Sequence, residues 1–371
     1  MDVSNYKRIV VKLGTSTLTA GTANLSPPRV VELVRQMASL QDQGHQIVLV
    51  SSGAMAAGRE RLAFPKLPKE IPAKQMLSAV GQPRLMALYE QLFGLYNLTI
   101  AQVLLTRTDL ANRRRYLNSR NTLAALISQR VIPIVNENDT VATEEIRVGD
   151  NDNLSALVAS LIEADLLLML TDQSGLYTAD PHHDPLAEMV TEISSAAISE
   201  SLWKAAGGTE NGLGTGGMLT KIQAANLARR SGVTVVIADG EEKDIILRVA
   251  GGERLGTRFT ALVSSLESRK RYILAGSSPQ GLLVVDAGAV KALQKGGSLL
   301  PVGIVQVTGG FERGDTVRVV DPEKKEIARG LVNYGAEHLE NILGQQSQAI
   351  ESILGFAYGD AVIHHNDMVL Y

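Results

Sequence analysis

The chain has 371 residues, of which 45% are hydrophobic and 20% are charged, an ordinary composition for a globular protein with room for two domains. Its formal net charge of −3 gives no general electrostatic case for nucleic-acid binding, and its lack of cysteine excludes disulfides and cysteine-ligated metal sites. Residues 1–5 show no basic stretch leading into an apolar core, and no apolar run approaches the roughly 18 residues of a membrane span, so we expect a soluble, cytoplasmic protein.

The first predicted strand carries a lysine in an apolar setting. Lys12 lies among Val and Leu residues at the carboxyl end of this strand, which runs into the turn-forming sequence Gly14-Thr15-Ser16. One interpretation is an edge-strand lysine whose stem carries the charge to solvent. The other is phosphate binding, since a lysine and the N–H groups of such a turn would face the same point.

Small residues follow the second predicted strand, residues 46–50. The run 51–58 is rich in Ser, Gly and Ala, which would let a backbone or a ligand approach closely. Helical periodicity recurs over residues 30–40, 72–95 and 109–129, and a further strand is predicted over residues 99–104.

Two runs of amides and carboxylates stand out in the middle of the chain. Asn136-Glu137-Asn138-Asp139 follows an apolar strand predicted over residues 131–135, and Gly149-Asp150-Asn151-Asp152-Asn153 precedes a helix beginning near Leu154. Each run could be a simple turn, because these residues favour turns. Polar groups at the carboxyl end of a strand are also where open α/β sheets bind ligands, and two such runs around one short excursion favour a site.

The next predicted strand, residues 164–172, ends in Thr171-Asp172, which could hold a nucleotide or could be an ordinary capped turn. A glycine-rich stretch over residues 207–217 then enters a helix that carries Lys221 in its first turn. A cation is disfavoured there unless an anion is bound. The stretch contains a literal G-x-G-x-x-G, but no strand precedes it, so we interpret it as a cradle for polyphosphate rather than a dinucleotide fingerprint.

Strands alternating with helices, including a strand at 234–238 and a helix at 242–250, predict the α/β class: a three-layer αβα sandwich around a mainly parallel sheet. After about residue 261 the pattern changes to short alternating runs separated by Gly and Pro, which predicts a small β-barrel-like domain. The expected division is a domain over residues 1–262, a linker over 263–278 and a second domain over 279–371.

The two lysines from remote segments suit phosphoryl transfer, which needs positioning and charge neutralisation rather than covalent chemistry. Asp150 is the candidate to hold the ammonium groups of Lys12 and Lys221 in place. A carboxylate acceptor is already ionised at pH 7, so the lack of an evident general base fits. The six histidines form no ligand pattern, and Mg²⁺ is expected to arrive with ATP, held mainly by phosphate oxygens.

Six stretches in a fixed order are specific when taken together: Val10–Ser16, Ser51–Ala54, Asn136–Asp139, Val148–Ser155, Thr171–Tyr177 and Gly214–Lys221. Over essentially the whole chain, this set resembles the glutamate 5-kinases of the amino acid kinase family. The resemblance implies ATP-dependent phosphorylation of the side-chain carboxylate of L-glutamate, the first step of proline biosynthesis. It also implies feedback inhibition by proline, a homo-oligomer that is commonly a tetramer, and functional association with the next enzyme of that pathway.

Carried over by position, the resemblance assigns Lys12 and Lys221 to stabilising the transferred phosphoryl group and Asp150 to orienting them. The residues implied for glutamate binding are Ser52, Gly53, Asn136, Asp139 and Asn151. The residues implied for ATP binding are Lys12, Thr171, Asp172, Thr215, Gly216, Gly217, Met218, Leu219, Thr220 and Lys221.

The carboxy-terminal part resembles the PUA domain that bacterial members of this family often append, notably over residues 296–304. Such domains elsewhere bind RNA. Residues 279–371, however, hold seven Lys and Arg against eleven Asp and Glu, and an acidic module disfavours phosphate contacts. We therefore expect a regulatory or structural role and no RNA partner.

Three rival functions stay open at this stage. The chain could be another kinase of the same family acting on aspartate, acetylglutamate, carbamate or UMP. It could be an RNA-binding regulator whose kinase fold is a relic, although the acidic second domain and the intact lysine pair disfavour this. A purely structural scaffold would bind no ATP.

Overall fold

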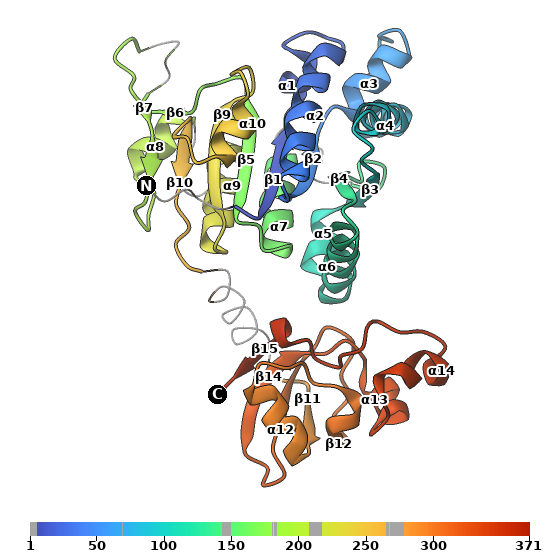
Figure 1. The fold of residues 1–371 in the computed structure, drawn as a ribbon. Helices are drawn as coiled ribbons and strands as arrows, with labels where there is room; N and C mark the ends of the chain where they lie inside the picture. Colours follow the sequence, from blue (N-terminus) through green and yellow to red (C-terminus); the bar gives the residue numbers. More distant parts are fainter. Residues whose placement is uncertain are drawn as a thin grey trace. The chain divides into compact units, whose positions relative to one another are not determined.

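The computed structural model describes residues 6–68, 70–142, 150–179, 181, 184–207, 217–264, 267 and 278–371, with the backbone alone described at position 150 (Figure 1). The chain divides into two compact units, one formed mainly by residues up to 265 and the other mainly by residues beyond 265.

The first unit is built on an eight-stranded sheet with the order β3-β4-β2-β1-β5-β9-β10-β8. Its strands are β1 (Arg8–Leu13), β2 (Gln46–Ser51), β3 (Ile100–Leu105), β4 (Ile132–Glu137), β5 (Leu166–Thr171), β8 (Glu192–Ile193), β9 (Thr234–Asp239) and β10 (Thr257–Phe259). The pairs are parallel except that β10 runs antiparallel to β9. A separate small ribbon pairs β6 (Leu176–Tyr177) with β7 (Met189–Val190). The predicted mainly parallel α/β sheet is confirmed.

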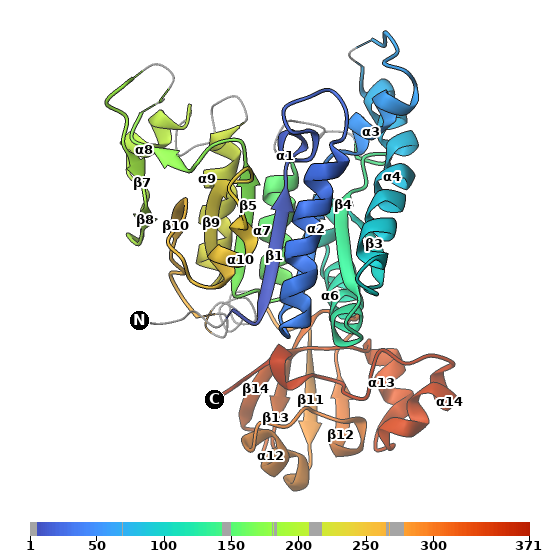
Figure 2. The same cartoon turned by 45° about the horizontal axis from the view of Figure 1, so that its top comes forward.

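Helices cover both faces of this sheet. They are α1 (Thr15–Thr19), α2 (Pro27–Asp42), α3 (Ala54–Arg61), α4 (Ile71–Gly94), α5 (Arg107–Ala111), α6 (Arg113–Ser128), α7 (Asp150–Leu161), α8 (Glu200–Ala205), α9 (Met218–Arg230) and α10 (Ile245–Ala250). One buried core joins α2, α4 and α10 to alternate residues of the strands, and in Figure 2 α2 lies in front of the sheet while α7 lies behind it.

The alternation of side chains along β1 places Lys12 on the α7 face. Ile9, Val11 and Leu13 belong to the core shared with α2, so Val10 and Lys12 point to the opposite face. In register, Leu13 is level with Ser51 of β2 and with Leu170 of β5. Because the carboxyl ends of these parallel strands meet at one edge, the segments that follow them gather there.

Two predicted elements differ from the structure in their bounds. The strand predicted over 131–135 is β4, which extends through Asn136 to Glu137 because the pairing with β3 continues that far. The helix predicted over 109–129 is two helices, α5 and α6, since Asn112 is extended between them. The Thr106 hydroxyl caps α5 by accepting from the Asp109 N–H (3.2 Å), which starts this helix before the predicted position.

The second unit contains a five-stranded sheet with the order β12-β11-β13-β14-β15. Its elements are β11 (Gly281–Val285), α12 (Ala287–Gln294), β12 (Ile304–Thr308), β13 (Thr316–Val320), β14 (Glu326–Leu331), α13 (Ala336–Ile342), α14 (Ile350–Leu354) and β15 (Met368–Leu370). Four of these strands match the predicted runs, whereas β15 and the three helices were missed because each is short. None of the helices in the described residues has the length and apolar character to cross a membrane.

Candidate active site

A pocket of about 800 Å³ lies at the carboxyl edge of the first unit's sheet. Segments that follow β1, β2, β4 and β5 line it, together with the first turns of α7 and α9. This is the edge where the sequence placed both lysines and both polar runs. Its two ends differ in chemistry, one being charged and the other made of amides and hydroxyls.

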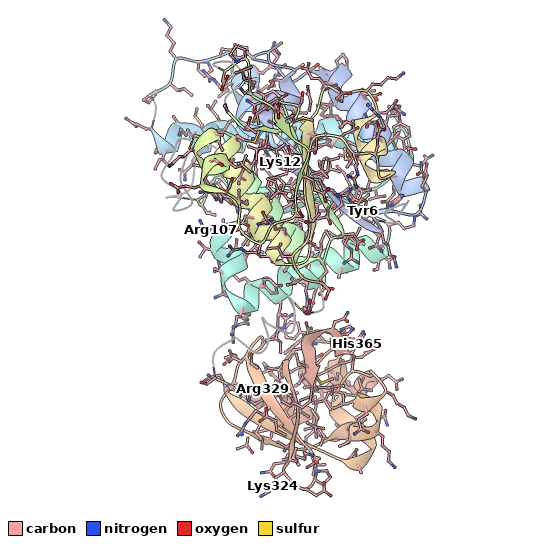
Figure 3. All side chains as sticks on the ribbon, turned by 90° about the vertical axis from the view of Figure 1, so that its left-hand side faces the viewer. Tyr6, Lys12, Arg107, Lys324, Arg329 and His365 are labelled. Carbon is pink, nitrogen blue, oxygen red and sulfur yellow. The ribbon has the colours of Figure 1, made fainter. Side chains whose placement is uncertain are left out.

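The charged end is a buried carboxylate between two lysines. The Nζ of Lys12 lies 2.6 Å from Asp152 Oδ1, and the Nζ of Lys221 lies 3.6 Å from Asp152 Oδ2. The Thr220 hydroxyl donates to the same Oδ2 at 2.7 Å. Lys12 and Asp152 are 4% and 1% exposed, and Figure 3 shows Lys12 inside the unit. The two remote lysines therefore meet at one point.

Burial and charge interactions oppose each other in this cluster. Burial alone would raise the pKa of Asp152, but the charges of Lys12 and Lys221 and hydrogen bonds from Lys12 and Thr220 hold that pKa below its usual value. Burial lowers the pKa of Lys221, with Asp152 opposing this decrease and Lys12 adding to it. Near neutral pH the cluster is an ionised carboxylate facing two cations, and the charge of Asp172 also stabilises the cationic form of Lys221.

The orienting role that we predicted for Asp150 stays a prediction. Asp150 begins α7, but its side chain lies outside the described residues. The carboxylate that meets both ammonium groups in the described part of the chain is Asp152, which the sequence analysis did not select. The two positions have the same residue type in one run, and only the direction in which each side chain leaves the helix could separate them.

The neutral end is a chain of hydrogen bonds between side-chain amides. The Asn151 Nδ2 donates to the Ser52 hydroxyl (2.9 Å) and to Asn136 Oδ1 (3.1 Å). Asn136 Oδ1 also accepts from the Glu137 N–H (2.9 Å), and Asn136 Nδ2 donates to Gln82 Oε1 (2.8 Å). Three of the residues predicted to bind glutamate are thus brought together: Ser52, Asn136 and Asn151. Gln82, which holds Asn136, was not anticipated, because it lies on a helix far away in sequence.

Gly53 and Asp139 also line the pocket. Gly53 has φ 99°, a backbone conformation that favours glycine, and a Cβ there would approach Leu18 Cδ1 to 2.9 Å, so the leucine side chain would have to shift. Burial raises the pKa of Asp139, and the neighbouring Ser78 hydroxyl opposes this shift. Asp139 is thus a half-buried carboxylate whose charge a cationic group of a ligand would stabilise.

The predicted nucleotide residues are only partly gathered at the pocket. Thr171, Asp172, Gly217, Thr220 and Lys221 line it. The Thr171 hydroxyl donates to Asp172 Oδ1 at 3.1 Å, and Gly217, with φ 73°, caps α9. Of the other predicted positions, Met218 and Leu219 do not line this pocket, and Thr215 and Gly216 lie outside the described residues.

Within the described residues, no three His, Asp or Glu side chains gather in a way that could hold a metal ion. The expectation that Mg²⁺ arrives with ATP, held mainly by phosphate oxygens, stays a prediction.

A mainly parallel α/β sheet with two lysines converging at its carboxyl edge is an arrangement that suits enzymes acting on anionic groups. The model of the amino acid kinase family matches residues 7–239, so the chain belongs to the amino acid kinase family. The model of the PUA domain matches residues 281–354 of the second unit.

Curated relatives match along the full length. Glutamate 5-kinase of Shewanella oneidensis is 54% identical over 366 residues, which cover 98% of each chain. Glutamate 5-kinase of Herpetosiphon aurantiacus is 54% identical over 372 residues, which cover 100% of each chain. Among solved structures, UMP kinase of Bacillus anthracis aligns with a TM-score of 0.47 and 17% identity, covering 70% of this chain and 97% of that one.

Proposed function

We propose that this chain transfers the γ-phosphoryl group of ATP to the side-chain carboxylate of L-glutamate, giving L-glutamyl 5-phosphate, the first step of proline biosynthesis. The observation that carries the proposal is the convergence of Lys12 and Lys221 on Asp152. The similarity to proteins named glutamate 5-kinase along the whole chain supports glutamate as the acceptor.

In this mechanism a glutamate side-chain oxygen attacks the γ-phosphorus, a new O–P bond forms, and the bond between the β–γ bridging oxygen and phosphorus breaks, releasing ADP. Lys12 approaches from the end of β1 and Lys221 from the first turn of α9. Their ammonium groups neutralise the charge that spreads over the phosphoryl oxygens in the transition state. Because a carboxylate is ionised near pH 7, no general base is needed.

Asp152 sets the spacing of the two lysines in this proposal. Its two oxygens each meet one ammonium group, so the cations are held near each other without a ligand. The two ammonium groups and the one carboxylate together carry a net positive charge, which a phosphate group of ATP would neutralise. Mg²⁺ bound to ATP would neutralise further phosphate charge.

The amide end would bind the amino acid. Asn151 Oδ1 is buried without a hydrogen-bond partner in the described part of the chain, and Asp139 carries a carboxylate. Both suit the ammonium group of an amino acid, while the Ser52 and Gly53 segment allows its close approach. Asp150 is a further candidate for orienting the lysines, and Thr171, Asp172 and the segment 215–221 are candidates for holding ATP.

We further propose inhibition by proline, a homotetramer, a cytoplasmic location and functional association with the next enzyme of the pathway. The acidic balance of residues 279–371 supports a regulatory or structural role for the second unit rather than RNA binding.

A coupled assay with ATP, Mg²⁺ and a panel of glutamate, aspartate, acetylglutamate, carbamate and UMP tests this function, with and without proline. We expect turnover with glutamate alone and a decrease when proline is added. Turnover with another member of the panel in place of glutamate would show that glutamate is not the phosphoryl acceptor. If the protein neither hydrolyses ATP nor transfers its γ-phosphoryl group to any member of the panel, it is not a kinase of this kind.

A further inference from the structure

Helix α4 contributes a buried side chain, Gln82, to the hydrogen bonds of the neutral end of the pocket. Gln82 is 9% exposed and does not line the pocket, yet its Oε1 accepts from Asn136 Nδ2 at 2.8 Å. The hydrogen bonds of the neutral end therefore extend from the residues that line the pocket to Gln82, which lies behind them.

The polarity of this chain of hydrogen bonds is fixed from one end. The backbone N–H of Glu137 can only donate, so the Asn136 atom that it meets at 2.9 Å is the oxygen. The other Asn136 atom is then an NH₂ group, and because Asn136 is 2% exposed, that group needs a protein acceptor. Gln82 Oε1 is that acceptor.

The same polarity passes to Asn151. Since Asn136 Oδ1 only accepts, the Asn151 atom 3.1 Å from it must be the NH₂ group, which also reaches Ser52. This leaves Asn151 Oδ1 as a buried acceptor with no partner in the described residues. If the Asn136 amide rotated by 180°, its NH₂ group would face the NH₂ group of Asn151. Asn151 would then lose the oxygen to which it donates, and its own Oδ1 would no longer be held toward the pocket.

The helix that carries Gln82 is held rigidly against the site. A Cβ on Gly81 would lie 1.8 Å from the Ala54 carbonyl oxygen, so α4 packs directly on the start of α3. Two turns further along α4, the Tyr89 hydroxyl meets the Ser51 hydroxyl at 2.8 Å, next to Ser52. Gln82 and Tyr89 therefore both contact the neutral end of the pocket from one face of α4.

We propose that Gln82 is a positioning residue for the bound amino acid: by accepting from Asn136 Nδ2 it holds Asn136 in the amide orientation that the Glu137 N–H sets, and through Asn136 it presents Asn151 Oδ1 to a donor group of the amino acid. This inference rests on the proposed function, because it takes glutamate as the acceptor. Among the described residues, no hydrogen bond or ion pair joins Gln82 to Lys12, Lys221 or Asp152, so we expect its substitution to leave ATP binding little changed.

The test compares Gln82→Met, which keeps the length of the side chain but removes the acceptor, with Gln82→Glu, which keeps an acceptor oxygen. Gln36→Met is the matched control, because Gln36 is a buried glutamine in the same unit whose Oε1 accepts from the Ile246 N–H (2.8 Å) away from the pocket. Steady-state KM values for glutamate and ATP, kcat and thermal stability are measured for the full chain.

We expect Gln82→Met to raise KM for glutamate by about 10-fold to 100-fold while KM for ATP stays within about twofold, the signature of lost acceptor binding. Gln82→Glu should keep KM for glutamate within about threefold of the parent, and Gln36→Met should change stability alone. An unchanged KM for glutamate in a folded Gln82→Met protein, or an equal rise in Gln36→Met, would overturn the proposal.

If Gln82→Met does not fold, Gln82→Glu decides alone: a KM for glutamate close to the parent value supports the role, and a rise of about 10-fold or more refutes it. The parent enzyme separates the two proposals. No turnover of glutamate by the parent overturns the proposed function, whereas normal parent turnover with an unaffected Gln82→Met variant overturns only the role of Gln82.

Discussion

The two ends of the pocket hold their functional groups by different physical means. At the charged end, the Asp152 carboxylate attracts the ammonium groups of Lys12 and Lys221 without strict direction, which offsets the repulsion between the two lysines, and burial strengthens that attraction. At the neutral end, Asn136 and Asn151 are held by hydrogen bonds whose donors and acceptors each have one permitted arrangement. The charged end should therefore tolerate small shifts but not loss of charge, and the neutral end should govern binding more than turnover.

The largest effect is expected from removing either lysine. Lys12→Ala and Lys221→Ala should each lower kcat by on the order of 10²-fold or more, because each cation acts on the transition state. Steady-state kinetics measure this. Lys204→Ala, which breaks an exposed pair with Glu200, is the control and should leave kcat unchanged. Near-normal turnover in Lys221→Ala would show that its assigned role is wrong.

Loss of the buried carboxylate should appear in stability as well as in rate. Asp152→Asn leaves two buried ammonium groups facing each other, and we expect it to lower the free energy of unfolding by about 3 kcal/mol near pH 7. Urea unfolding measures this, with Glu200→Gln as an exposed control that should leave the free energy of unfolding unchanged. Equal stabilities of parent and Asp152→Asn would mean that the carboxylate has little interaction with the lysines.

The same variant gives a pH dependence of known sign. The pKa of Asp152 is lowered in the folded chain, so its stabilisation is complete above the ordinary carboxyl pKa of about 3.9 and is lost as the pH falls through the folded value. The stability difference between parent and Asp152→Asn should therefore shrink on acidification below about pH 4. A difference that grows on acidification would contradict the direction of this shift.

A smaller effect is expected at the neutral end. Asn136→Ala removes the middle of the amide chain, and we expect KM for glutamate to rise about 10-fold while KM for ATP is little changed, because the charged end is untouched. Kinetics with each substrate varied in turn measure this. A decrease in kcat with an unchanged KM for glutamate would contradict the claim that the neutral end acts mainly on binding.

The smallest effect is a local strain. Gly53→Ala should destabilise the chain by about 1–3 kcal/mol, since alanine tolerates positive φ poorly and its Cβ meets Leu18. Gly44→Ala is the control, because Gly44 also has positive φ (94°) but an open surrounding. Thermal melts of the two variants separate the packing contribution from the backbone contribution, and equal losses would indicate that the contact with Leu18 is unimportant.

The sequence was sufficient where a periodic pattern carried the information. The alternation of strands with helices was enough to predict the mainly parallel sheet, and the settings of Lys12 and Lys221, together with the family resemblance, were enough to pair the two lysines. The choice between Asp150 and Asp152 needed side-chain directions within one turn, and neighbouring carboxylates in a run give no sign of these. Gln82 was missed because its partner lies on β4, 54 residues further along the chain, and nothing local marks it.

Coupling between the two lysines can be measured with kcat for Lys12→Ala, Lys221→Ala and the double variant. Because both ammonium groups meet one carboxylate and would act on one phosphoryl group, we predict that the double variant loses little more than the worse single variant. Losses that multiply, on the order of 10⁴-fold in the double variant, would show that the lysines act independently and would contradict a shared phosphoryl site.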